Sequence, residues 1–140
     1  MLFRSRLGVP VVYAIGKRMA DPHLVTIEGM PTVTFYGANT DPVGANRTKQ
    51  NPLMIFEGHL TRGFTRTFWA SIDLLWREGG EVKVDGIGAD NSQSALSLGT
   101  TGTFSLAHNL SLRLSAGKVV ARNAHGPDGW MLRTIIGTVF

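Results

Sequence analysis

The last eleven residues of the chain, 130–140, alternate in polarity down to the final residue, and this segment constrains the fold most. One side of the alternation carries Trp130, Leu132, Ile136 and Phe140, and the other carries Arg133 and Gly137. Successive side chains of a β-strand point to opposite faces, so this pattern predicts a strand. A soluble domain does not need a strand that closes on phenylalanine. The segment therefore favours an all-β protein that is not a soluble domain.

Length and composition narrow the possible folds. The 140 residues suit one modest domain, and no internal composition shift marks a boundary. No run of eighteen apolar residues exists, which excludes a helical membrane protein. A mean hydropathy of +0.04 with abundant Gly, Ser and Thr is expected where lipid-facing and lumen-facing positions alternate. The absence of cysteine removes disulfides, thiol catalysis and Cys-based zinc sites.

The charge distribution and the amino-terminal segment argue against nucleic-acid binding and against a signal peptide, respectively. The net charge is +4, but the basic residues are scattered without a dense patch, which argues against nucleic-acid binding. Residues 1–16 have the basic and apolar regions of a signal peptide. Lys17 and Arg18 nevertheless follow where a small-x-small cleavage site would stand. We therefore expect a strand over 8–16 and no export signal in this chain.

A period of two recurs along the whole chain and predicts about seven strands. They cover 8–16, 23–36, 52–64, 66–77, 93–106, 109–121 and 129–140. Most are long enough to cross a bilayer when tilted. The connections 17–22, 65 and 107–108 are short, whereas 37–51, 78–92 and 122–128 are long and rich in Gly, Asn, Asp and Pro. Short turns at one end and long loops at the other are typical of an up-and-down membrane barrel.

The alternation separates an apolar face from a polar one. The apolar set is Met54, Phe56, Leu60, Phe68, Ala70, Ile72, Leu74, Trp76, Leu96, Leu98, Phe104, Leu106, Leu110, Leu112, Leu114 and Ala116. Charged residues collect on the other face across consecutive strands. A soluble sheet with one buried face gives the same alternation. Strand length and the aromatics near strand ends (Tyr36, Phe64, Phe68, Trp76 and Trp130), where interfacial girdles lie, favour a membrane barrel.

The final strand resembles the closing strand of bacterial outer-membrane β-barrels, whose terminal aromatic residue is recognised during assembly. This resemblance implies that Phe140 is an assembly signal, and that outer-membrane lipid and the barrel assembly machinery are partners. Seven strands is an awkward number, because single-chain bacterial barrels have an even count. We therefore expect a C-terminal part of a larger barrel, truncated at its amino end. An unrecognised eighth strand and self-association are the alternatives, and 82–84 is too short to be that strand.

A second resemblance covers residues 9–140. The motifs are Gln50-Asn51-Pro52-Leu53, Gly58-His59-Leu60, Phe68-Trp69-Ala70-Ser71-Ile72-Asp73, Gly79-Gly80, Val84-Asp85-Gly86 and Asp90-Asn91-Ser92-Gln93. Upstream, Thr26-Ile27-Glu28, Val33-Thr34-Phe35-Tyr36 and Asn39-Thr40-Asp41-Pro42 extend the pattern. In order and spacing these resemble the C-terminal half of the outer-membrane transporter family of the MetA-pathway of phenol degradation. The ending Gly137-Thr138-Val139-Phe140 departs from that family, which often closes on aromatic and basic residues. The resemblance implies a barrel that passes small hydrophobic or aromatic compounds inward.

The polar face supplies the candidate site residues. The charged and titratable side chains expected to face the lumen are Glu28, Glu57, His59, Asp73, Arg77, Arg113 and Arg133. Glu57, His59 and Asp73 invite an acid–base interpretation, but no nucleophile or second base completes a triad. We expect instead that they pair with Arg113 or Arg133, because a lipid-facing Arg near the midplane costs about 2–4 kcal/mol.

Other motifs carry no chemistry. Residues 85–91 hold carboxylates and glycines, but the spacing fits no EF-hand and the closing Glu is missing, so we expect an exposed turn. The four histidines share no metal-binding spacing. No catalytic residue, metal or cofactor is expected.

The sequence thus predicts an all-β, antiparallel, up-and-down transmembrane barrel segment in the bacterial outer membrane. It would act as a channel for passive uptake of small hydrophobic or aromatic compounds and not as an enzyme. The alternatives are a soluble lipocalin-like barrel that binds a small apolar ligand on its apolar face, and a structural outer-membrane barrel without transport.

Overall fold

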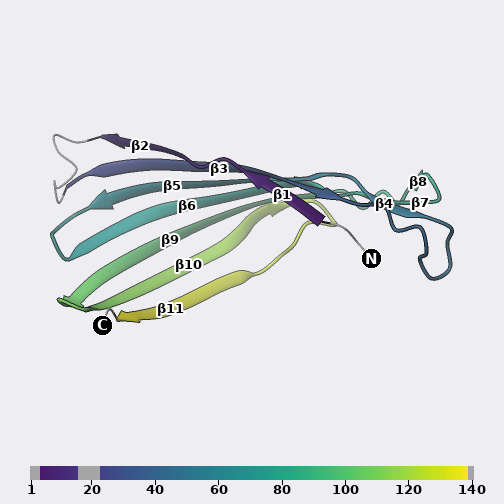
Figure 1. The fold of residues 1–140 in the computed structure, drawn as a ribbon. Helices are drawn as coiled ribbons and strands as arrows, with labels where there is room; N and C mark the ends of the chain where they lie inside the picture. The colour runs from purple at the N-terminus through teal and green to yellow at the C-terminus, as the bar shows by residue number, and fades with distance from the viewer. Residues whose placement is uncertain (1–3, 16–22, 139–140) are drawn as a thin grey trace.

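The computed structural model describes residues 4–15 and 23–138, and their regular structure consists entirely of strands (Figure 1). The strands are β1 (Arg4–Gly8), β2 (Val11–Ile15), β3 (Val25–Tyr36), β4 (Thr48–Gln50), β5 (Leu53–Gly63), β6 (Phe68–Gly79), β7 (Val82–Val84), β8 (Ile87–Gly88), β9 (Gln93–Ala107), β10 (Leu110–Arg122) and β11 (Trp130–Thr138). None of the described residues forms a helix long and apolar enough to cross a bilayer.

One long sheet contains most of the chain. Its order is β1-β3-β5-β6-β9-β10-β11, with β2 also paired to β3, and every pairing is antiparallel. Within this sheet the strands β3, β5, β6, β9, β10 and β11 lie side by side in chain order, which is the up-and-down order that the sequence predicted. The seven predicted strands correspond to seven positions in this sheet, and the boundaries differ by a few residues. The all-β, up-and-down prediction is confirmed.

Strands β1 and β2 together fill the first position. Both pair with β3, and the register continues unchanged from the Gly8–Thr32 pair to the Val11–Gly29 pair. Between them the Val9 N–H still donates to the Pro31 carbonyl over 3.1 Å. The ladder is interrupted here because neither Pro10 nor Pro31 has an N–H to donate. The predicted strand over 8–16 therefore begins earlier, at Arg4, and is broken once.

The two ends of the sheet differ as expected. At one end, β5 and β6 are joined by 64–67 and β9 and β10 by 108–109. The predicted short connection 17–22 lies outside the described residues. The longer connections meet at the opposite end, where β4, β7 and β8 form a small sheet of their own (Figure 1). Residues 82–84 are thus a strand of the loop region and not an eighth strand of the long sheet.

The exposed turn predicted over 85–91 is present at 85–86, whereas 87–88 form β8. The turn links two long loops. Asp85 and Gly86 have φ of 50° and 87°, which fits a tight two-residue turn between β7 and β8. The Asp85 carboxylate accepts the backbone N–H of Arg47 over 2.7 Å and that of Asn46 over 3.0 Å. This carboxylate therefore holds the loop before β5 against the loop after β6.

A third long connection, 123–129, joins β10 to β11 at the same end. Its Asp128 carboxylate accepts the backbone N–H of Gly129 over 2.8 Å and lies 3.1 Å from the Arg122 guanidinium. Both contacts favour the ionised form and lower the pKa of Asp128.

The long sheet remains open. The first position, β1 with β2, and the last, β11, each pair with one neighbour among the described residues. Both edge strands run from the long-loop end to the short-turn end, because seven antiparallel positions return the last strand to the direction of the first (Figure 1). Phe140 lies outside the described residues, two positions beyond the end of β11 at the short-turn end.

The sheet buries little apolar surface. Among the described residues, only Leu53 and Ala95 are buried hydrophobic residues, while Thr32, Thr34, Ser71 and Thr103 are buried polar ones. These six residues share one face of the sheet. Large apolar side chains are exposed along the other face, among them Leu60, Ile72, Leu98, Leu114, Trp130 and Ile136. A sheet with this distribution leaves its apolar face without a protein layer to cover it.

Aromatic rings lie at both ends of the apolar face. Phe64, Phe68 and Phe104 stack at the short-turn end, with ring centroids 5.4 Å and 4.6 Å apart. Trp76 and Trp130 lie on the same face toward the long loops. Tyr36 was also expected in this girdle, and that expectation is wrong. Its pairing with Arg4 places it on the face of Thr32 and Thr34, where the Arg4 guanidinium lies 5.8 Å from its ring.

Candidate functional site: the polar face

The seven residues expected to face the lumen share one face of the long sheet. Directly paired residues of an antiparallel ladder lie on the same face, as do residues two apart on one strand. Glu28 is paired with His59, and His59 with Asp73. The remaining members follow by the same rule through the pairs of β6, β9, β10 and β11. We call this face, which carries Glu28, Glu57, His59, Asp73, Arg77, Arg113 and Arg133, the polar face.

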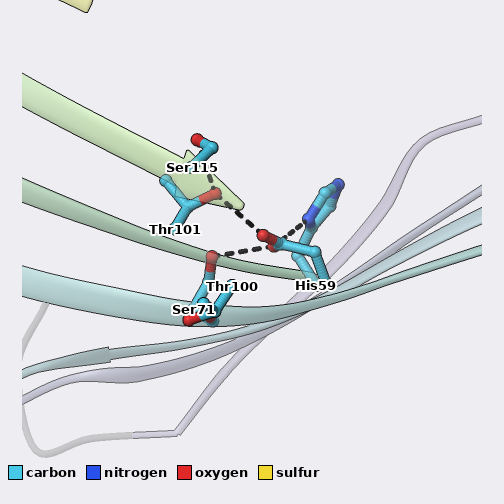
Figure 2. Close-up of polar contacts among 6 residues, drawn as sticks. His59, Ser71, Thr100, Thr101 and Ser115 are labelled. Carbon is cyan, nitrogen blue, oxygen red and sulfur yellow. Dashed lines mark hydrogen bonds and ion pairs between the residues drawn. The ribbon is translucent and has the colours of Figure 1, made fainter. Parts of the chain in front are cut away.

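Asp73 is the centre of a hydrogen-bond network on the polar face. Figure 2 shows the members His59, Ser71, Thr101 and Ser115. The His59 Nδ1 atom lies 2.7 Å from Oδ1 of Asp73. The hydroxyl of Ser71 donates to the same oxygen over 2.8 Å, and that of Thr101 donates to Oδ2 over 2.8 Å. Three partners from β5, β6 and β9 thus converge on one carboxylate. A half-buried carboxylate needs such partners, because water reaches it only in part.

The network extends to β10 through Ser115. Its Oγ lies 3.0 Å from Oγ1 of Thr101. A hydroxyl has one proton, and that of Thr101 is directed to the carboxylate, so the Ser115 hydroxyl donates to Thr101. The dashed lines in Figure 2 join His59 of β5, Thr101 of β9 and Ser115 of β10 into one network. The network therefore connects four strands of the sheet side by side.

The expected pairing of the acids with Arg113 or Arg133 is wrong. Asp73 is held by His59, Ser71 and Thr101 instead. Glu57 pairs with Arg6 of β1, with 3.8 Å between Oε1 and Nη2. The Arg113 Nε donates to the Thr103 hydroxyl over 3.3 Å, and its guanidinium lies 5.5 Å from the Trp69 ring centroid. Register explains the difference, because Arg113 lies opposite Thr103, two residues along β9 from the partner of Asp73.

Two of the predicted residues lie apart from this group. Arg77 is paired with Ile55 and Ala95 toward the long loops, and its Nε is buried without a hydrogen-bond partner among the described residues. Glu28 lies across from His59 on the side away from Asp73. Neither residue lines the hollow described next.

A hollow of about 620 Å³ lies over the polar face. Its polar lining includes Glu57, His59, Asp73, Arg113 and Arg133, which are five of the seven predicted residues, together with Thr101 and Ser115. Its apolar lining includes Leu75, Val119, Met131 and Ile135. Gly99 and Gly117 are paired beside Asp73 and also line it. Because neither has a side chain, the surface recedes there.

Sequence reasoning missed three contributors. Arg6 was assigned to a signal-like start, although it lies two residues before Gly8 on a strand of the sheet. Trp69 was read within a motif, although its odd position on β6 puts it on the polar face with Ser71 and Asp73. Thr101 has no role in the sequence analysis, although its pairing with Ser71 puts it on the same face. The period of two along each strand could have placed Arg6 and Trp69 on the polar face. The contact of Thr101 with Asp73 could not be predicted in this way, because it depends on cross-strand register.

The arrangement does not form a serine–histidine–acid triad. In such a triad a hydroxyl is hydrogen-bonded to the histidine, and the acid contacts the other ring nitrogen. Here the Ser71 and Thr101 hydroxyls donate to the carboxylate itself. Within residues 4–15 and 23–138, no three His, Asp or Glu side chains are grouped to hold a metal ion. The network's geometry suits holding strands together and presenting a polar wall.

Comparisons with known proteins bear on the fold. No protein-family model matches the chain, and no curated protein matches it. The fold is similar to the crystal structure of the COG4313 outer membrane channel from Pseudomonas putida F1, with a TM-score of 0.66 and 15% sequence identity. The similarity covers 95% of this chain and 47% of that chain. The chain therefore has the fold of part of an outer-membrane channel and spans about half the length of the protein it matches.

Proposed function

We propose that this chain forms part of the wall of a β-barrel channel in the bacterial outer membrane. The observation that carries the proposal is the contrast between the two faces. One face is apolar and uncovered, while the other holds a hydrogen-bonded polar network beneath a hollow of about 620 Å³. Contact with lipid would stabilise the apolar face, and contact with a water-filled lumen would stabilise the polar face. The likeness in fold to an outer membrane channel supports the same conclusion.

The dimensions of the apolar face suit a membrane. On β9 the outward residues run from Leu96 to Leu106. This span is about ten steps of about 3.3 Å, or roughly 33 Å along the strand. A strand tilted by about 40° then covers about 25 Å of thickness, which matches the apolar band of outer-membrane barrels. Charged residues on this face lie toward the ends, with Arg62 near the short turns and Lys118 and Glu78 near the long loops.

A soluble lipocalin-like barrel is less well supported. In that fold the apolar face would line the ligand cavity and the charges would face water. The hollow of about 620 Å³ instead lies over the polar face, and the described residues supply only two buried hydrophobic side chains as a core.

Orientation and closure follow from the topology. In outer-membrane barrels the short turns are periplasmic, so β11 would descend and Phe140 would stand near the periplasmic rim. There it would serve as the signal that the assembly machinery recognises. Because both edge strands run in the same direction, antiparallel closure needs an odd number of further strands between them. A second copy in the same orientation would instead join through parallel pairs.

The solute is assigned as a small hydrophobic or aromatic compound. The mixed lining of the hollow supports this assignment, since Leu75, Val119, Met131 and Ile135 lie among its polar residues. Membership of the MetA-pathway transporter family, which the sequence motifs suggest, is part of this proposal.

The test is refolding of the full chain with and without lipid vesicles, followed by solute flux. We expect far-UV circular dichroism of β-structure and heat-dependent gel mobility only with lipid. We also expect vesicles carrying the protein to admit benzyl alcohol faster than empty vesicles. A folded soluble monomer without lipid would contradict the proposal. Lipid-dependent folding without flux would leave a structural barrel that does not transport.

A further inference from the structure

The acids that line the hollow already have ion-pair or hydrogen-bond partners that stabilise their charge, whereas the arginines do not have a charged partner. Glu57 is paired with Arg6, and Asp73 accepts from His59, Ser71 and Thr101. Among the described residues, the guanidinium of Arg113 contacts only neutral groups, the Thr103 hydroxyl and the Trp69 ring. The side chain of Arg133 has no hydrogen bond or ion pair within the part of the chain that the structure describes. The hollow therefore presents two cations that no carboxylate of the described sheet neutralises.

The two arginines are neighbours on the polar face. Arg113 is paired with Ile135 and Arg133 with Ser115, so they stand diagonally across the β10–β11 ladder. Diagonal residues of an antiparallel pair lie about 7–8 Å apart, within reach of long side chains. Two like charges at this spacing repel each other, and an anion held between them removes that repulsion. Guanidinium groups also match a carboxylate in shape, since each offers two parallel N–H donors.

The surroundings of the pair are apolar. Ile135 lies directly opposite Arg113, and Met131 lies two residues from Arg133 on β11. Both line the hollow, as do Val119 and Leu75. Its volume of about 620 Å³ is within the range of small-molecule sites, about 300–1,000 Å³. An anion with an apolar body can therefore place its charge on the arginines and its body on these side chains.

We propose that Arg113 and Arg133 form an anion subsite in the channel wall that binds the carboxylate of a small organic acid with an apolar body. The inference rests on the proposed function, because it assigns the hollow to the lumen. It narrows the solute class from hydrophobic compounds in general to those that carry one carboxylate.

Binding of three probes to the refolded full chain tests the subsite. The probes are benzoate, benzyl alcohol and acetate, measured by equilibrium dialysis in lipid vesicles at low salt. Benzyl alcohol has the apolar body without the charge, and acetate has the charge without the body. We expect benzoate to bind at least tenfold more tightly than either. Raising the salt concentration should weaken benzoate binding and leave benzyl alcohol binding unchanged.

Variants assign the effect to the two arginines. The double variant Arg113→Gln/Arg133→Gln should lose at least tenfold in benzoate affinity and keep its affinity for benzyl alcohol. Arg62→Gln is the matched control, since Arg62 lies on the opposite face with its guanidinium over the Phe64 ring. It should bind benzoate as the unaltered chain does. Circular dichroism and heat-dependent gel mobility establish that each variant is folded.

The outcomes separate this inference from the proposed function. Equal binding of benzoate and benzyl alcohol, or full benzoate affinity in the double variant, overturns the subsite and leaves the channel intact. Benzoate binding by a chain that folds as a soluble monomer overturns the channel and leaves the subsite. If the double variant does not fold, the comparison of the three probes on the unaltered chain decides, because it needs no substitution.

Discussion

The two faces of the long sheet use glycine in opposite ways, and β9 carries an example of each. On the polar face, a Cβ built on Gly99 would stand 2.9 Å from the Ala116 carbonyl oxygen, so backbone fills the space. On the apolar face, a Cβ on Gly102 would meet only the rings of Phe68 and Phe104, at 3.6 Å and 3.7 Å. The first glycine allows two strands to approach closely beneath the hollow. The second is covered by aromatic rings.

This difference follows from what each face contacts. Polar side chains on one face are hydrogen-bonded to one another across four strands, because isolated polar groups on a partly shielded wall are costly. The opposite face needs no such network, since its rings and aliphatic chains are stable wherever the surroundings are apolar. Under the proposed function, the sheet is organised by lipid on one face and water on the other and not by a buried core. Each of the following predictions tests one part of this contrast.

The largest effect is expected for a charge placed in the middle of the apolar face. Leu114 is 41% exposed and is paired with Gly102 and Thr134 at mid-strand. Leu114→Arg should make folding into vesicles less favourable by about 2–4 kcal/mol, the cost of Arg near a bilayer midplane. Urea titration of refolding into vesicles measures it.

Ser97→Arg is the control, because Ser97 lies on the neighbouring strand but lines the hollow. Its effect should be less than about 1 kcal/mol, as for an exposed surface substitution. Equal losses for the two variants would contradict the assignment of faces.

An intermediate effect is expected in the polar network. Asp73→Asn replaces one carboxylate oxygen by an amide that cannot accept a hydrogen bond, so one of three donors loses its partner. The loss should be about 1–3 kcal/mol in the same titration. Asp90→Asn is the control, since Asp90 lies in an exposed loop with φ of 52°, a conformation that asparagine adopts readily. A stable Asp73 variant would show that the network does not hold the strands together.

The smallest effect distinguishes the two glycines. Gly99→Ala should cost about 1 kcal/mol, because the added methyl group meets a backbone oxygen that cannot move alone. Gly102→Ala should be neutral or slightly stabilising, since its methyl group enters ordinary contact with two rings. Heat-dependent gel mobility of both variants in vesicles gives the order of stability. The reverse order would mean that the strands approach more closely on the apolar face.

Much of the fold follows directly from the chain. The period of two places Leu112 and Leu114 on one side of β10 and Arg113 and Ser115 on the other, and the structure preserves this division. Turn residues such as Asp85 and Gly86 predicted an exposed turn, and the structure places it between β7 and β8. The break at Pro10 was less evident, because a strand pattern over 8–16 does not reveal that a second proline, Pro31, lies across from Val9.

The partners of the polar residues could not be derived in this way. The sequence places Asp73, Arg113 and Arg133 on one face, but a strand face is long and its residues are several ångströms apart. The tertiary structure aligns Asp73 with His59 and Thr101, and leaves Arg113 opposite Thr103. Alternation along single strands thus determined the all-β class and the two faces, and the lengths of the connections determined the short and long ends. Cross-strand register, which depends on all neighbouring strands together, decided which charges meet and which two remain unpaired.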